Sequence, residues 1–271
     1  MSPLWRDEIG IYLAPHKLAL TRLARGLRPK SVGSANWSGS LGQDAHWRAP
    51  MAALDSLLGK PEWQGAVARV VLSDHWVRYA MVPYSAALSG ATERLTHARH
   101  VLTDIYGEVV ADWTVALANG RPGKAQVACA VPTTLLDELH VTLRRHKIPL
   151  RSLQPQLVCA YNHWRAQLPD GGAWFVSIEQ GSLAAARLGT GGWDRVHSVR
   201  LGADWTIELQ RLRTFGRLAG TQSHEGRVYV DAPVALRVVA RTAGPDLVWL
   251  EEPLAGESTN GRLEFLRRHQ A

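Results

Sequence analysis

The chain has 271 residues, of which 46% are hydrophobic and 20% charged, an ordinary globular composition rather than a disordered one. No uncharged apolar run approaches the roughly 18 residues of a membrane span, and the N-terminus lacks the basic start and apolar centre of a signal peptide. We therefore expect a cytosolic protein that reaches a membrane only through a partner. Cys129 and Cys159 lie too far apart for a metal clip, so we expect two buried thiols.

The formal net charge of +7 raises the question of an acidic partner. The positive charge is spread along the chain, with no Lys/Arg block longer than a pair. The densest cluster, Arg144-Arg145-His146-Lys147, falls at the end of a predicted helix, where cations complement the helix dipole. Solubility and helix capping explain this distribution; contact with an acidic protein or with lipid headgroups is the alternative.

Hydrophobic periodicity divides the chain into the strands and helices of an α/β protein. In chain order, it predicts two strands around a turn at 15–16 within 8–23, a strand over 31–38, a helix over 49–58, two strands within 68–82 and a helix over 92–106. Strands over 110–118 and 126–131 and helices over 133–147 and 156–168 follow. The last part predicts strands over 174–178, 183–188 and 194–201, a helix over 204–218, and strands over 227–230, 234–240 and 247–249.

An internal match indicates that one part of this pattern is duplicated. Residues 11–23 read I-Y-L-A-P-H-K-L-A-L-T-R-L and residues 176–188 read V-S-I-E-Q-G-S-L-A-A-A-R-L, aligned without a gap at an offset of 165 (176 − 11). Leucine, alanine and arginine coincide within the aligned segments, and Gly26 falls on Gly191 at the turn into the next strand. The coincidence of these positions favours a duplicated β-hairpin.

Two copies of a three-stranded unit, each followed by helices, resemble the actin-like nucleotide-binding superfamily with its RNase H-like mixed-sheet subdomains. The arrangement between the copies is similar to FtsA, PilM and the cytoplasmic domain of GspL, which carry a small α+β insert in the first half. The strand and capped helix around 130–136 look like the corresponding family segment. The resemblance implies a first subdomain at 1–67 plus 150–170, an insert at 68–149 and a second subdomain at 171–271.

Active members of this superfamily carry Asp-x-Gly at the hairpin turn of each copy, where the aspartate orients metal and water and the glycine admits phosphate. The first pair falls on Tyr12 and Ala14, and the second on Ser177 and Glu179. All four expected residues are absent, and Glu179 places negative charge where a phosphate would sit. In addition, the segment 231–233 is Asp-Ala-Pro where the family has a glycine-rich turn. We therefore expect no bound nucleotide or other cofactor, and no catalytic residues.

Other catalytic and metal-binding patterns are missing too. The sequence has no phosphate-binding G-x-x-x-x-G-K-[ST] loop and no G-x-S-x-G elbow. The 11 histidines are scattered without the spacing of a metal set. We expect no metal site.

The resemblance implies a non-catalytic scaffold of a type IV pilus or type II secretion machine at the cytosolic face of the inner membrane. Its expected partners are an assembly ATPase and a cytosolic peptide of a membrane component, and the resemblance also allows a homodimer. Such a peptide would dock between the first subdomain and the insert, for which Arg94, Arg99, Arg144 and Arg145 are our candidate contacts. The first alternative is a divergent actin-like ATPase or small-molecule kinase, with phosphates held by Lys17, Ser182 and Thr190. The second alternative, which rests on charge alone, is a binder of nucleic acid or anionic membrane; we expect no nucleic acid.

Overall fold

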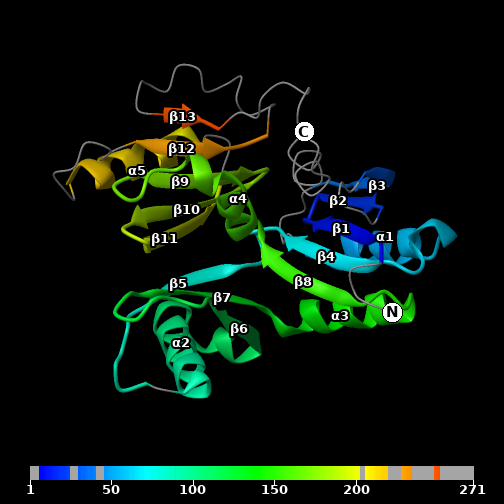
Figure 1. Cartoon of the computed structure of the whole chain (residues 1–271), viewed down its shortest axis with the longest axis horizontal. Coiled ribbons are helices and arrows are strands. Elements are labelled where there is room, and N and C mark those ends of the chain that lie inside the picture. The colour runs from blue at the N-terminus through cyan, green and yellow to red at the C-terminus, as the bar shows by residue number, and fades with distance from the viewer. Residues whose placement is uncertain are drawn as a thin grey trace. The chain divides into compact units, whose positions relative to one another are not determined.

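The structure is a computed structural model that describes residues 6–24, 30–40, 46–88, 90–201, 205–218, 227–233 and 247–250. The chain divides into two units, each assembled from segments that are separate in the sequence. The first unit holds the described parts of 1–75 and 134–163, and the second those of 76–133 and 164–251. Figure 1 gives the element labels used below.

A five-stranded mixed sheet in the order β3-β2-β1-β4-β8 is the centre of the first unit. Its strands are β1 (Glu8–Leu13), β2 (Lys17–Leu23), β3 (Ser31–Ser38), β4 (Val67–Leu72) and β8 (Leu150–Pro155). β2 pairs antiparallel with both β1 and β3, while β4 pairs in parallel with β1, and β8 in parallel with β4. Central β1 is almost entirely buried, as expected for a strand covered on both faces.

Three helices belong with this sheet: α1 (Arg48–Leu58), α3 (Thr133–Arg145) and α4 (Gln156–Trp164), with a short 3-10 turn at η2 (Pro61–Trp63). A second short turn, η4 (Arg165–Gln167), lies in the second unit. Asp55 of α1 joins α1 to the end of α3, since its carboxylate accepts hydrogen bonds from Arg145 at 2.8 Å and His146 at 2.9 Å. The bond to His146, followed by the one to Arg145, lowers the pKa of Asp55. These contacts are local to α1 and the α3 terminus.

The second unit contains a matching five-stranded sheet in the order β11-β10-β9-β12-β13. Its strands are β9 (Trp174–Glu179), β10 (Ser182–Gly189), β11 (Gly192–Arg200), β12 (Val228–Asp231) and β13 (Leu247–Trp249). Helix α5 (Thr206–Leu218) buries Leu209 and Leu212 against the face that carries Val176 and Ile178 of β9. This apolar layer forms the core of that sheet.

The same unit holds a three-stranded antiparallel sheet in the order β5-β7-β6, with helix α2 on one face. Its elements are β5 (Arg78–Val82), α2 (Ala91–Tyr106), η3 (Glu108–Asp112), β6 (Trp113–Leu117) and β7 (Gln126–Pro132). Ala98 and Leu102 of α2 pack against Val82 of β5 and Val115 of β6. We refer to this α2-covered sheet as the insert.

The backbone pairing confirms the predicted duplication. In the first hairpin Ile11 lies opposite Leu20, and in the second Val176 lies opposite Ala185, which is the same pair moved by 165 positions. The register between the second and third strands shifts between Arg22 and Leu23 in one copy and between Arg187 and Leu188 in the other. Because 22 + 165 = 187, the irregularities coincide as well. The α/β fold with duplicated mixed sheets is therefore confirmed.

The expected limits of the insert, 68–149, stay a prediction. Strand β4 pairs with β1, and most of α3 belongs to the first unit, while the elements of the insert sheet lie within 76–133 of the second unit. The sequence also gave no prediction of β8, which pairs with β4. The strand predicted over 234–240 lies outside the described residues, as does Gly26.

Two further expectations concern the thiols and the membrane. Cys129 and Cys159 form no disulfide, and each is partly rather than fully buried, which corrects the expectation of two buried thiols. None of the helices in the described ranges combines the length and the apolar character that crossing a membrane requires.

Candidate functional site

The first hairpin turn is formed by two residues, Pro15 and His16, between the ends of β1 and β2. The N–H of Ala14 donates to the carbonyl of Lys17 at 2.9 Å, and the N–H of Lys17 donates back at 3.3 Å. The N–H of Ser73, which follows β4, donates to the carbonyl of Leu13 at 2.9 Å. The turn is therefore fixed by backbone bonds to its own strands and to the neighbouring strand.

The predicted positions Tyr12 and Ala14 lie together on one face of the sheet, beside Val71 of β4. Their exposed fractions are 6% and 0%, and the partly buried Cys159 of α4 packs against the cluster that they form with Val71. The Asp-x-Gly motif has a carboxylate and no side chain at these two positions, whereas here the phenol ring of Tyr12 and the methyl group of Ala14 occupy the space. The first of the two phosphate positions is thus an apolar cluster, to which we refer as the first-copy cluster (Tyr12, Ala14, Val71 and Cys159).

The environment of the first turn lowers the pKa values of its two basic residues, His16 and Lys17. Burial, and then the positive charges of His75 and Lys17, lower the pKa of His16 from 6.5 to about 4. Burial also lowers the pKa of Lys17. At neutral pH the imidazole of His16 therefore carries no charge with which to hold a phosphate.

Asp74, which follows β4, is also engaged in the structure. Its Oδ2 accepts the N–H of Leu157 at 2.9 Å, in the first turn of α4, and its exposed fraction is 4%. A carboxylate at the start of a helix satisfies one of the amides that have no partner within the helix. Asp74 thereby holds α4, and with it Cys159, against the sheet.

The second hairpin has a different chemistry at the equivalent face. Ser177, Glu179 and the paired Asp231 of β12 are all buried, with exposed fractions of 1%, 5% and 0%. The hydroxyl of Ser182 donates to the Glu179 carboxylate at 3.3 Å across the turn. A buried carboxylate at the glycine position opposes the approach of a phosphate. We refer to Ser177, Glu179 and Asp231 as the second-copy cluster.

The four candidate arginines do not share one environment. Arg99 of α2 donates to the carbonyls of Val110 at 3.1 Å and Trp113 at 3.2 Å, and so joins α2 to the η3 segment and β6. Arg144 is exposed in the last turn of α3 and donates to the carbonyl of His140 at 3.3 Å. Arg145 pairs with Asp55 at 2.8 Å. Arg94 lines a groove in the insert.

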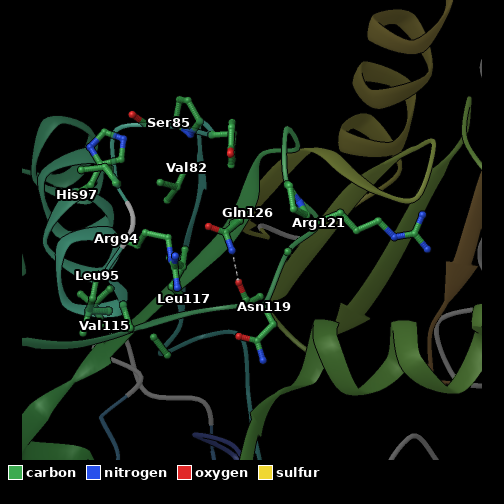
Figure 2. Close-up of a pocket in the computed structure, with 18 of the residues that line it drawn as sticks. Val82, Ser85, Arg94, Leu95, His97, Val115, Leu117, Asn119, Arg121 and Gln126 are labelled. Carbon is green, nitrogen blue, oxygen red and sulfur yellow. Dashed lines mark hydrogen bonds between the residues drawn. The ribbon is translucent and has the colours of Figure 1, made fainter.

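That groove lies at one end of the insert and has a volume of about 610 Å³. Its walls are the first two turns of α2, the segment 83–88 after β5, and β6 with the turn that follows it (Figure 2). Gln126 lies between these walls and donates from Nε2 to the carbonyl of Ala118 at 3.0 Å. Arg94 was predicted from the sequence as a contact residue, but Gln126 and Leu117 were not. The alternation of a strand does not show where the covering helix ends and leaves the sheet exposed.

No group of three or more His, Cys, Asp or Glu side chains within the described residues is arranged to hold a metal ion. The described residues thus present three features: the first-copy cluster, the second-copy cluster and the groove of the insert.

Comparison with known proteins places the fold. No protein-family model matches the sequence, and no curated protein matches it. A chain of the PilM–PilN type IV pilus biogenesis complex is similar in structure, with a TM-score of 0.64 and 14% identity, over 90% of this chain and 88% of that one.

Two further structures are similar over nearly the whole chain. A Bacteroides thetaiotaomicron protein with an actin-like ATPase fold and unknown function gives a TM-score of 0.61 at 9% identity, over 97% of this chain and 96% of its own. The cytoplasmic domain of EpsL, an inner membrane component of the type II secretion system of Vibrio cholerae, gives 0.56 at 12%, over 97% and 93%. The chain has an actin-like fold.

Proposed function

We propose that the chain is a non-catalytic scaffold that binds protein partners at the cytosolic face of the inner membrane, in type IV pilus or type II secretion assembly. The proposal takes its setting from the PilM–PilN complex and the EpsL cytoplasmic domain, which are similar in fold. Its expected partners are an assembly ATPase and a cytosolic peptide of a membrane component. The absence of catalysis is argued from this chain's own residues.

The observation that carries the proposal is the first-copy cluster. An actin-like nucleotide site needs room and backbone N–H groups for phosphate at the hairpin turn. Here Ala14 is fully buried in a cluster with Tyr12 and Val71, and Cys159 packs against this cluster. A phosphate could enter only if α4 moved and this apolar contact were broken.

The second-copy cluster supports the same conclusion by charge rather than by volume. Glu179 and Asp231 are two buried carboxylates on neighbouring strands, in a sheet that would have to face the same nucleotide. Repulsion between a carboxylate and a phosphate is strong where water is excluded. Both copies of the motif therefore oppose phosphate, for independent reasons.

Calorimetric titration with Mg-ATP and Mg-ADP at near-physiological salt tests the non-catalytic part of the proposal. We expect no binding up to millimolar nucleotide. Micromolar binding would contradict the proposal and favour the divergent ATPase or kinase instead.

Cross-linking in the native bacterium, with a tagged copy of the full chain, tests the scaffold part. We expect a pilus or secretion assembly ATPase, or a membrane component with a cytosolic segment, among the cross-linked proteins. Recovery of nucleic acid instead, with affinity that falls steeply with salt, would contradict it.

A further inference from the structure

We propose that β3 pairs along its outer edge with β3 of a second molecule of this chain, antiparallel about a two-fold axis at Asn36. The inference goes beyond the proposed scaffold function and concerns the sheet of the first unit. In the strand order β3-β2-β1-β4-β8, β3 (Ser31–Ser38) is an end strand (Figure 1). Within the described residues it pairs with β2 and with no other strand.

The backbone of β3 presents hydrogen-bonding groups on the side that faces away from β2. The N–H of Gly39 donates to the carbonyl of His16 at 2.9 Å, so the backbone groups of residue 39 point toward β2. Opposed residues of an antiparallel pair alternate between bonded and non-bonded pairs. The N–H and carbonyl groups of Ser34, Asn36 and Ser38 therefore point outward, where no strand within the described residues pairs with them. Such an edge can accept a further strand.

The corresponding strand of the second unit carries charges that β3 lacks. Backbone pairing gives Arg195 of β11 the place that Gly33 has in β3. Arg200 of β11 likewise has the place of Ser38, and β11 also contains Asp194. None of the 8 residues of β3 is charged, and none is proline. Charged side chains and prolines on an edge strand oppose pairing with another chain, so β3 lacks a protection that β11 has.

Pairing of β3 with itself uses all of these outward backbone groups in one register. Asn36 lies opposite Asn36 of the second molecule, and Ser34 lies opposite its Ser38. Each of these pairs exchanges both N–H···O=C bonds, because outward residues face outward residues. Although the chain carries a net charge of +7, this register brings no like charges of the two strands opposite one another. The same surface thus serves both molecules, as a two-fold interface requires.

The side chains of β3 also match one another in this register. Trp37 lies opposite Ala35 of the second molecule, which places a large side chain against a small one. The indole of Trp37 lies over Gly39, where an added Cβ would be 2.6 Å from Cη2. Gly39 in turn lies opposite Gly33 of the second molecule, so the residues around the indole are small. A strand of another protein would satisfy the same backbone groups, but the match of Trp37 with Ala35 is present within β3 itself and favours a second molecule of this chain.

Sedimentation velocity of the full chain, at concentrations from nanomolar to high micromolar, tests the inference. We expect a monomer–dimer equilibrium that depends on concentration. Asn36→Lys places two like charges opposite each other at the axis and should weaken the dimer by about tenfold or more, and Asn36→Asp should do the same. An equimolar mixture of the two variants should form a dimer again, with one molecule of each, because lysine then lies opposite aspartate.

Asn119→Lys and Asn119→Asp are the matched controls, because they make the same changes at an exposed asparagine in the other unit. They should leave the equilibrium unchanged. Asn36→Pro serves as a further variant if circular dichroism shows that a charged variant has not folded. It removes an outward N–H, a position at which an edge strand tolerates proline, and it should weaken the dimer in the same direction.

Hydrogen exchange measured by mass spectrometry locates the interface. The amides of 31–38 should be protected at concentrations at which the dimer forms, and they should exchange faster on dilution and in Asn36→Lys.

The inference is overturned if the chain stays monomeric at every concentration, or if the folded variants at Asn36 dimerise as the parent does. It is also overturned if the mixture of Asn36→Lys and Asn36→Asp stays monomeric. Protection of 31–38 that persists in the monomer would assign the edge to another segment of the same chain, and protection that requires an added assembly protein would assign it to that protein. Either result would overturn pairing with a second molecule while leaving the scaffold function to its own tests.

Discussion

The two hairpin copies have the same backbone but opposite side-chain chemistry on one face. Tyr12 lies opposite Ala19 and beside Val71, and Ser177 holds the same place opposite Ala184 and beside Asp231. In the first copy this face is apolar and packed against Cys159. In the second it carries two carboxylates that are buried.

The comparison shows that backbone pairing determines the strand order and register of a hairpin but not the side chains on its exposed or site-facing side. Strand order, register and the irregularity after Arg22 and Arg187 are the same, because they depend on backbone hydrogen bonds and on the buried alternate face. The face that would meet a nucleotide in an active member has diverged in two directions. In the function that we propose, each direction, apolar filling or added negative charge, opposes phosphate.

Exchanging the residues at the third position of the Asp-x-Gly motif, Ala14 and Glu179, tests this difference with the largest expected effect. Ala14→Glu gives the first copy the residue of the second and buries a carboxylate beside Tyr12 and Val71. We expect it to lower the free energy of unfolding by about 4 kcal/mol, because an uncompensated buried charge is strongly unfavourable. Urea denaturation measures the loss.

The reverse exchange, Glu179→Ala, is the matched control. It removes a buried carboxylate and leaves the Ser182 hydroxyl without that acceptor. We expect a change of about 1 to 2 kcal/mol. Equal effects of the two exchanges would mean that the first-copy face tolerates charge and would remove the basis of the comparison.

Removing the carboxylate that holds α4 tests what keeps the first copy closed. Asp74→Ala leaves the buried N–H of Leu157 without its 2.9 Å acceptor, for which we expect a loss of about 2 kcal/mol. The partly buried Cys159 should then react faster with a thiol reagent, as mapped by mass spectrometry. Asp74→Asn keeps an oxygen acceptor and should change both quantities less. Unchanged reactivity in Asp74→Ala would show that α4 is held by other contacts.

The pH dependence of stability tests the neutral state of His16. Its pKa is about 4 in the folded chain and 6.5 in the unfolded one, so between these values the unfolded chain binds more protons. Stability is therefore unaffected above about pH 6.5 and falls as the pH drops toward 4. His16→Gln should remove about 1 to 2 kcal/mol of this fall, a figure reduced because the imidazole is only half-buried.

Urea denaturation of both proteins at pH 7 and pH 4.5 measures this difference. Carboxyl groups such as Asp55, whose pKa is lowered, also change stability toward acid pH in both proteins, so only the difference between parent and variant reports His16. Parallel pH profiles would show that His16 is as easily protonated in the folded chain as in the unfolded one.

The sequence predicted the hairpins well because turn, alternation and arginine recur at a constant offset, and the structure retains each of them. It missed β8, whose residues 150–155 read L-R-S-L-Q-P and lack strict alternation; its strand pairing comes from β4, a partner far away in the sequence. The pairing of β4 with β1 likewise joins residues far apart in the sequence, so the sheet to which a strand belongs does not follow from its local pattern.

The candidate site could be predicted only in part. The positions Tyr12, Ala14, Ser177 and Glu179 follow from the resemblance to the actin-like superfamily, whose Asp-x-Gly motif falls on them. The contact of Cys159 with the first cluster and the pairing of Asp231 with Ser177 are tertiary, and no local pattern contains them. The groove likewise depends on how far α2 covers its sheet.

The smallest effect is expected at the turns themselves, where the two copies use different residues. The second turn places Gly181 at φ +83°, a conformation that costs a residue with a Cβ about 1 kcal/mol, whereas Pro15 and His16 in the first turn keep negative φ. We expect Gly181→Ala to lower the free energy of unfolding by about 1 kcal/mol. Gly33→Ala in β3 is the control, because its added Cβ meets only the Arg22 Cβ at 3.9 Å and its φ is not in the left-handed region. Equal stability of the two variants would mean that the second turn relaxes to a conformation like that of the first, and the copies would then differ in their faces alone.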